Sequence, residues 1–385
     1  MVSRRAFLAG TTLLSACGVT RAPRYHAWLF VASAGEKAVV VTDLASFHRS
    51  GAIDMGTVPN QVLSARGKVF AVCDGNQSVV RIDPVRQTVV SKVAVGGRIV
   101  GAALTTGGDY LVVATSQPSA AVLIDTGSGK IIRRTGLAGI PFAIAAADAQ
   151  AAILLASKPG SEPDYIARLK IPDGVLLGVS ATGSGPLRAL NYRKDGRTIF
   201  VAAPDARQIV TLDAMTGSIL ARLPVPIRPA RFCTDGTGGQ VFVTGADRED
   251  QLVIFSPFQN QVDQTLYAGR SPFGMAVAAE RNLLFLTSPE AGSVTIVDID
   301  TRGIRASVRT GGNPREILIA STTGLDEEYA FVVDGDTGDV SVIHIPVVLQ
   351  KPEALIADTP KPVFTVFHGG SAPQSAVIVP YSTSM

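Results

Sequence analysis

Six arginines stand at equivalent points of a repeated sequence pattern, within three residues of the position that opens each repeat. They are Arg98, Arg188, Arg228, Arg231, Arg270 and Arg315. A guanidinium presents forked donors that match the oxygens of a carboxylate or a phosphate. In two other repeats Gln61 and Glu316 hold the place that Arg231 holds, two residues after the opening proline. If the repeats bring these side chains together, we expect a positive rim that binds a small anion.

Two alternatives compete with this candidate rim. In the first, each arginine pairs with a carboxylate from a neighbouring loop, and the rim is neutral. The acidic residues available for such pairs are Asp74, Asp205, Asp247, Glu249, Asp250, Glu290 and Asp334. In the second, the protein is an enzyme, Arg188 and Arg231 hold an anion, and Glu316 acts as acid or base. No Gly-x-Ser-x-Gly motif or Ser/His/Asp spacing adds support, so we assign no catalytic residue.

Five aspartates look catalytic in isolation, because each ends an alternating apolar stretch. They are Asp43, Asp83, Asp125, Asp213 and Asp298. Each precedes a polar turn, such as DTGSG or DAMTG, whose N–H groups can donate to the carboxylate. Since these aspartates follow the repeat instead of converging on one site, we interpret them as turn caps.

Residues that could bind a metal are few. His344 and His368 end strands of the last repeat and could approach each other, but two histidines make a poor zinc site. The segment 334–339, DGDTGD, has the alternating carboxylates of a calcium loop without the trailing glutamate, which favours a plain turn. No Cys-x-x-Cys-His run occurs, and there is one tryptophan. We therefore expect no metal and no cofactor.

The N-terminus carries two export motifs in the order expected of an anchored protein. Residues 3–8, Ser-Arg-Arg-Ala-Phe-Leu, resemble the twin-arginine signal. Residues 14–17, Leu-Ser-Ala-Cys, resemble a lipobox. The resemblance implies a signal peptide over 1–16, lipidation of Cys17 and a tether over 17–27. Acyl chains on Cys17 would hold an exported domain, periplasmic or at the cell surface, against a membrane.

The composition favours buried strands joined by tight turns. Of the residues, 46% are hydrophobic and 17% are charged, with 38 glycines and 23 prolines, which argues against disorder. A formal net charge of +3 disfavours nucleic acid as a partner. Beyond the N-terminal segment, no apolar run reaches the roughly 18 residues of a membrane-spanning helix. Cys73 and Cys233 lie in apolar stretches far apart, and we expect buried free thiols.

A unit of four short strands recurs about every 40–45 residues, which is the spacing of a propeller blade. A proline opens most units, at a point where no ladder N–H is needed. The pattern predicts an all-β protein with a single β-propeller of four-stranded blades over 28–380. Counting gives eight blades. Seven is the alternative if the weakest unit, DYIARLKIPDGVLLG at 164–178, is absorbed elsewhere.

The two ends of the repeat array are complementary. The chain enters at the second strand of its first unit, near Trp28. Residues 371–380, SAPQSAVIVP, repeat the proline-entry strand without a unit of their own. We predict that this strand completes the first blade and closes the ring, which leaves no open sheet edge. Residues 381–385 would be a short tail.

Residues 272–300, PFGMAVAAERNLLFLTSPEAGSVTIVDID, resemble the repeat of YVTN-type propeller proteins. Residues 241–245, VFVTG, approach the tetrapeptide that names the family. The resemblance covers about 28–380 and implies the propeller fold. It says little about function, because such propellers occur as surface-layer proteins, periplasmic binding modules and companions of dehydrogenases.

The sequence thus predicts an exported, lipid-anchored propeller. We expect a binding or scaffold module whose arginine-bearing face takes an envelope protein or a small anion. A propeller-type lactonase or lyase and a periplasmic metal-binding protein are the alternatives.

Overall fold

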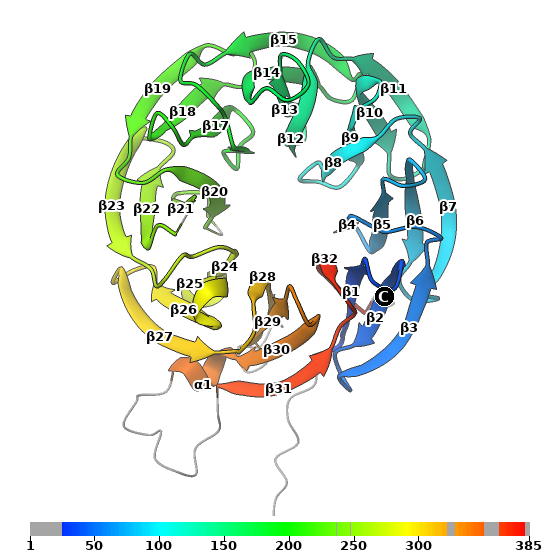
Figure 1. Cartoon of the computed structure of the whole chain (residues 1–385), viewed down its shortest axis with the longest axis vertical. Helices are drawn as coiled ribbons and strands as arrows, with labels where there is room; N and C mark the ends of the chain where they lie inside the picture. Colours follow the sequence, from blue (N-terminus) through cyan, green and yellow to red (C-terminus); the bar gives the residue numbers. More distant parts are fainter. Residues whose placement is uncertain (1–24, 236, 247, 322–327, 350–361, 382–385) are drawn as a thin grey trace, which may run out of the picture.

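The computed structural model describes residues 25–235, 237–246, 248–321, 328–349 and 362–381. In this part of the chain, eight four-stranded antiparallel sheets stand around a central axis (Figure 1). The prediction of an eight-bladed all-β propeller is confirmed, and the seven-bladed alternative is wrong. The weakest unit contributes the two outer strands of a blade of its own.

We number the blades by chain order and give each from its innermost to its outermost strand. Blades 1 to 4 are β32 (Pro373–Pro380), β1 (Ala27–Ser33), β2 (Ala38–Asp43), β3 (His48–Asp54); β4 (Gln61–Ala65), β5 (Lys68–Cys73), β6 (Ser78–Asp83), β7 (Thr88–Ala94); β8 (Ile99–Leu104), β9 (Tyr110–Ser116), β10 (Ser119–Asp125), β11 (Ile131–Gly136); β12 (Ile140–Ala146), β13 (Gln150–Ala156), β14 (Pro163–Lys170), β15 (Val175–Ala181).

Blades 5 to 8 continue in the same order. They are β16 (Ala189–Tyr192), β17 (Thr198–Ala203), β18 (Gln208–Asp213), β19 (Ile219–Pro224); β20 (Pro229–Thr234), β21 (Val241–Gly245), β22 (Gln251–Ser256), β23 (Gln261–Tyr267); β24 (Met275–Ala278), β25 (Leu283–Ser288), β26 (Ser293–Asp298), β27 (Gly303–Arg309); β28 (Pro314–Ser321), β29 (Glu328–Asp334), β30 (Asp339–His344), β31 (Val363–His368). Among the described residues, three short helices accompany them: η1 (Ala279–Arg281), η2 (Pro289–Ala291) and α1 (Ile345–Leu349). No helix of the described residues is long and apolar enough to cross a membrane.

The C-terminal strand closes the ring, as the sequence predicts. In Figure 1, β32 lies beside β1 on the channel side of blade 1, and Leu29 pairs with Ile378 in their antiparallel register. The closure extends past the predicted end of the propeller. The ring of Tyr381 packs on Trp28, with centroids 4.2 Å apart, and its hydroxyl donates to Asp43.

The core lies between neighbouring blades. The second and third strands of each blade are buried on both faces, whereas the outermost strands, such as β7 and β11, are mostly exposed. At the seam of blades 5 and 6, Phe200 meets Phe255 edge-on, with centroids 5.5 Å apart. Burying a phenylalanine side chain contributes about 1.5–3 kcal/mol. Sheet-on-sheet packing of this kind therefore holds each blade to the next.

A β-bulge marks the entry of several innermost strands. In blade 6, Pro229 pairs with Gly245 and Arg231 with Thr244, so Ala230 is an extra residue on its strand. The entries of blades 3, 4 and 8 carry the same register shift. A bulge leaves one residue unpaired in the hydrogen-bond ladder and changes the direction in which nearby side chains point. This explains why the repeats can differ just after the proline while the rest of the blade stays alike.

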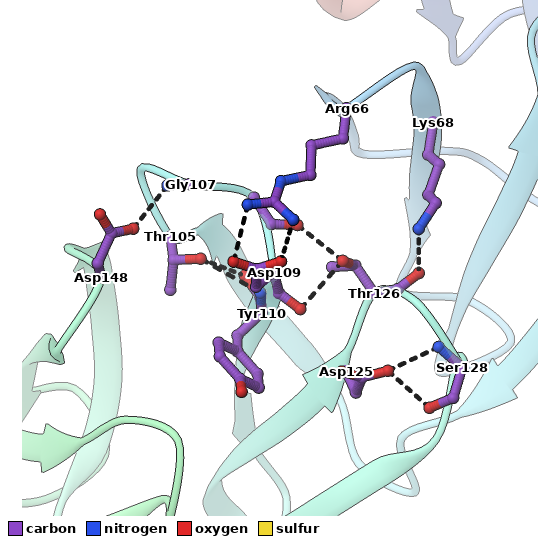
Figure 2. Close-up of polar contacts among 11 residues, drawn as sticks. Arg66, Lys68, Thr105, Gly107, Asp109, Tyr110, Asp125, Thr126, Ser128 and Asp148 are labelled. Carbon is purple, nitrogen blue, oxygen red and sulfur yellow. Dashed lines mark hydrogen bonds and ion pairs between the residues drawn. The ribbon is translucent and has the colours of Figure 1, made fainter.

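On the opposite face, turns of neighbouring blades are joined by polar contacts (Figure 2). Arg66 of blade 2 forms an ion pair with Asp109 of blade 3, and the N–H of Gly107 donates to Asp148 of blade 4 over 2.6 Å. Within blade 3, Asp125 accepts the N–H and the hydroxyl of Ser128. Arg66, Asp109 and Asp148 thus tie blades together on this face, whereas Asp125 holds its own turn.

Candidate anion-binding site

Near the strand entries, arginine and phenylalanine side chains of neighbouring blades come into contact at the channel mouth. Arg231, two residues after the proline of blade 6, lies over Phe273, one residue after the proline of blade 7. The distance from Cζ to the ring centroid is 3.5 Å. Arg315 of blade 8 lies 5.2 Å from the same ring, and Arg188 of blade 5 lies 6.0 Å from Phe142 of blade 4. Such cation–π contacts position a guanidinium without neutralising it.

The three arginines and Phe273 line a cavity of about 570 Å³, which we call the arginine cavity. Its charged lining residues are Arg188, Arg231, Arg248, Arg315, Glu249 and Glu290. The arginines other than Arg248 come from strand entries, and the glutamates come from connections between second and third strands. Phe273 and Pro272 supply its apolar wall. The volume falls within the range of about 300–1,000 Å³ found for small-molecule sites.

Three of these arginines have no ion pair with any described residue: Arg188, Arg231 and Arg315. Burial and the nearby charges of Arg188 and Arg315 lower the pKa of Arg231 to about 10. Burial and the neighbouring charges both oppose the charged form of Arg231, so its positive charge is held here at an energetic cost. A bound anion would offset that cost and would accept the free donors.

The two glutamates of the cavity are already engaged. Glu249 accepts the N–H of Arg228 over 2.6 Å and lies 3.6 Å from Arg207. Glu290 pairs with Arg248 at 3.0 Å. The carboxylates therefore neutralise Arg207 and Arg248, and the excess positive charge falls on the unpaired arginines.

The other arginines of the candidate rim lie outside this cavity. Arg98 pairs with Asp74 at 3.6 Å, and Arg228 with Asp205 at 2.5 Å, as the neutral-rim alternative expects. Arg270 is exposed and does not line the arginine cavity. Asp247, another expected partner, lies outside the described residues. The six arginines thus divide into three that converge and three that do not.

Gln61 and Glu316 join blades at equivalent positions. The side-chain oxygen of Gln61 accepts the N–H of Ala102 in the next blade over 3.2 Å. The carboxyl of Glu316 accepts the N–H of Ala376, which occupies the same place in blade 1. Burial raises the pKa of Glu316 to about 7. Glu316 lines a neighbouring cavity of about 460 Å³.

Sequence reasoning missed the two phenylalanines and Arg248. Phe142 and Phe273 each directly follow a proline that opens a repeat. An aromatic residue at this position was a local signal available in the sequence. In the structure, the side chain of Phe142 is 42% exposed. Arg248 carried no such signal, because its place at the cavity depends on a connection between strands.

The remaining candidates are structural. Asp298 accepts the N–H of Thr301 over 2.8 Å, and its four counterparts cap turns in the same way. Asp334 accepts the N–H groups of Asp336 and Thr337, so segment 334–339 contains a turn.

The expectation that the two histidines approach each other is wrong. Antiparallel pairing of β30 with β31 sets His368 opposite Asp339, at the far end of β30 from His344. Cys73 and Cys233 are free, and burial raises their pKa to about 11 and about 12. Cys17 lies outside the described residues.

Comparison with known proteins shows the fold of this chain but does not assign the chain to a family. No family model matches the sequence, and no curated protein matches it. Among solved structures, dihydro-heme d1 dehydrogenase NirN in complex with DHE is similar with a TM-score of 0.70 at 14% identity, over 93% of this chain and 77% of that one. AztD from Citrobacter koseri has a TM-score of 0.68 at 12% identity, over 92% and 98%. Hydrazine synthase of Kuenenia stuttgartiensis has a TM-score of 0.55 at 16% identity, over 74% and 95%.

These structural neighbours carry diverse functions on a shared propeller architecture, so they do not assign one to this chain. The similarity to YVTN-type repeats likewise stays a prediction from the sequence pattern.

Proposed function

We propose that this propeller binds a small anionic ligand at its channel mouth. The observation that carries the proposal is the convergence of Arg188, Arg231 and Arg315 on one cavity without a described carboxylate partner. Guanidinium groups bind carboxylates and phosphates through paired hydrogen bonds, and Phe273 holds two of the three in place. Anion binding thus uses the charges that the fold leaves unpaired.

The test is thermal unfolding with a panel of anions at matched ionic strength: phosphate, sulfate, succinate, glutarate and citrate. A ligand at 100 times its Kd stabilises a protein by about 2.7 kcal/mol. We expect at least one anion to raise the Tm of the wild type, and the double variant Arg188→Ala/Arg231→Ala to abolish that shift. Arg66→Ala, which removes an ion pair on the opposite face, should retain it. The proposal fails if no anion shifts the wild type or if both variants respond alike.

A second candidate function is catalysis of the lactonase or lyase type. It is favoured by Glu316, whose pKa of about 7 suits an acid or base at neutral pH. Glu316 lines the cavity next to the arginines but also accepts the N–H of Ala376, which gives it a structural role. Turnover of any member of a lactone panel, lost in Glu316→Gln, would establish the enzyme. Absence of turnover with intact anion binding would set it aside.

We propose further that the propeller acts outside the cytoplasm as a lipoprotein. The support is the order of a twin-arginine-like motif, an apolar stretch and a lipobox-like segment ending at Cys17. Cell fractionation of the full chain tests it. We expect the wild type in the membrane fraction and Cys17→Ala in the soluble periplasmic fraction or unprocessed. Equal distribution of both would contradict the anchor.

A further inference from the structure

A second cavity adjoins the arginine cavity. It has a volume of about 460 Å³, and its lining includes Glu316, Asp336 and Gln374. Phe273 and Arg315 line both cavities, so the two meet at these side chains. We call the second one the acidic cavity. Together they reach from blade 5 across blades 6, 7 and 8 to the strand that completes blade 1.

Apart from Arg315, which is unpaired and lines both, the two cavities differ in the sign of their unpaired charges. In the arginine cavity, Arg188 and Arg231 have no ion pair with a described residue. In the acidic cavity, Glu316 and Asp336 have no ion pair with a described residue either. Glu316 accepts one backbone N–H, from Ala376, and Asp336 accepts the side-chain amide of Asn313 over 2.9 Å. Each carboxylate has room for about four hydrogen bonds, so both keep free acceptor sites.

Apolar side chains lie between the charges. Phe273 stands at the junction beside Arg315, with Pro272 on the arginine side and Pro373 and Val333 on the acidic side. A purely anionic ligand would use the first cavity and would face the carboxylates of the second. A ligand with an anionic end and a cationic end would satisfy both, and the neutral part between its ends would lie along the apolar wall.

We infer that the ligand is a zwitterion of oligopeptide size. Its carboxylate lies at Arg188 and Arg231, and its ammonium group lies at Glu316 and Asp336. This inference rests on the proposed function and names its ligand class. Two adjoining cavities of this volume exceed what a single amino acid fills, while a site of up to about 1,000 Å³ suits a ligand of several residues.

The probes are trialanine and tetraalanine, each in three forms: free, N-acetylated and C-amidated. Alanine supplies no charged side chain, so the forms differ only in the end groups. We expect the free peptide to bind the wild type by titration calorimetry. Acetylation and amidation should each weaken binding roughly tenfold or more, which is the loss of a charge-assisted contact. An N-acetylated peptide that binds as tightly as the free one would overturn the inference.

Variants separate the two ends. Glu316→Gln keeps an acceptor for the N–H of Ala376, as Gln61 does at the same position of blade 2. It should weaken the free peptide about tenfold and leave the N-acetylated peptide within about twofold. Arg231→Ala should weaken both. If Glu316→Gln weakens both peptides equally, the ammonium contact is wrong.

Succinate and glutarate distinguish this failure from that of the proposed function. One outcome is that these dianions bind the wild type and bind Arg231→Ala more weakly, while no free peptide binds better than its N-acetylated form. In that case the zwitterion inference falls and anion binding stands. If no peptide and no anion of the thermal-unfolding panel binds, both fall.

Discussion

The guanidinium of Arg231 stacks on the ring of Phe273, 42 residues further along the chain, with Cζ 3.5 Å from the ring centroid. The two residues belong to neighbouring blades, and each follows the proline that opens its own blade. Their contact fixes one positive group at the mouth of the channel. Since the ring cannot accept a proton or a charge, the guanidinium keeps its donors for a ligand.

Removing that ring should weaken anion binding. Phe273→Leu keeps the apolar volume but removes the π face, and we expect a loss of about threefold to tenfold in affinity, corresponding to about 0.6–1.4 kcal/mol. Phe142→Leu is the matched control, because Arg188 lies 6.0 Å from its ring. It should change affinity less than about twofold. Titration of the anion that stabilises the wild type measures both, and equal losses would contradict a special role of Phe273.

The pKa of Glu316 makes stability depend on pH in a defined direction. Its folded pKa of about 7 lies above its ordinary value of 4.5, because the carboxyl is buried. Between these values the unfolded chain has lost the proton that the folded chain keeps, so stability falls as pH rises from about 4.5 to 7. Arg315 and Asp336 are the other charged residues that line the same cavity.

Glu316→Gln isolates this contribution. We expect the free energy of unfolding of the wild type, relative to the variant, to fall by about 1–3 kcal/mol over that interval and then to level off. The range allows for partial contact of the side chain with solvent. Urea unfolding at half-unit steps of pH measures the difference. A flat difference would show that the carboxyl is ionised throughout.

Two glycines at the same repeat position should respond differently to alanine. A Cβ on Gly274 would overlap the carbonyl oxygen of Arg315, which is backbone of the next blade. Blades 7 and 8 would have to separate, and we expect a loss of about 1–3 kcal/mol in unfolding free energy. A Cβ on Gly101 would meet Ile144 at 3.6 Å, an ordinary contact. Gly101→Ala should therefore stay within about 0.5 kcal/mol. Thermal unfolding of the two variants measures the difference. A Gly274→Ala variant as stable as the wild type would contradict the close approach of Gly274 to the backbone of Arg315.

Asp298 should matter for stability and not for chemistry. Its carboxylate accepts the N–H of Thr301, which also lowers its pKa. Asp298→Ala should cost about 1 kcal/mol, and Asp298→Asn, which keeps an acceptor, should recover most of it. The advantage of the aspartate over asparagine should disappear as pH falls through its lowered folded pKa. Ligand affinity should be the same in all three proteins, and a change confined to affinity would argue against the turn-cap role.

The thiols should be slow to react. Burial raises the pKa of Cys73 to about 11 and of Cys233 to about 12, so the thiolate is scarce at about pH 8. A thiol reagent should label neither residue in the folded protein and both after unfolding. Peptide mapping assigns the labelled sites. Labelling of Cys233 as fast as a fully exposed thiol would show that the packing around its side chain opens under native conditions.

The repeat pattern by itself determined much of the fold. The short apolar stretch 38–43 and its copies, each ended by turn residues, set the strands, because a strand buried on both faces is a short apolar run. The orphan strand at 371–380 determined how the ring closes, since an unpaired entry strand and a blade lacking one fit only each other. Turn caps such as Asp298 were equally predictable, because a side chain bonding its own turn is a local event.

The site needed the tertiary structure. Arg98 and Arg231 occupy comparable places in the sequence, yet one pairs with Asp74 and the other stacks on Phe273. The difference arises between blades, where the packing of one sheet on the next sets which loops meet. Such contacts join residues far apart in the chain, and no periodicity within a blade encodes them. The sequence therefore determined where a site could be built, and the packing of neighbouring blades decided which arginines were left free to build it.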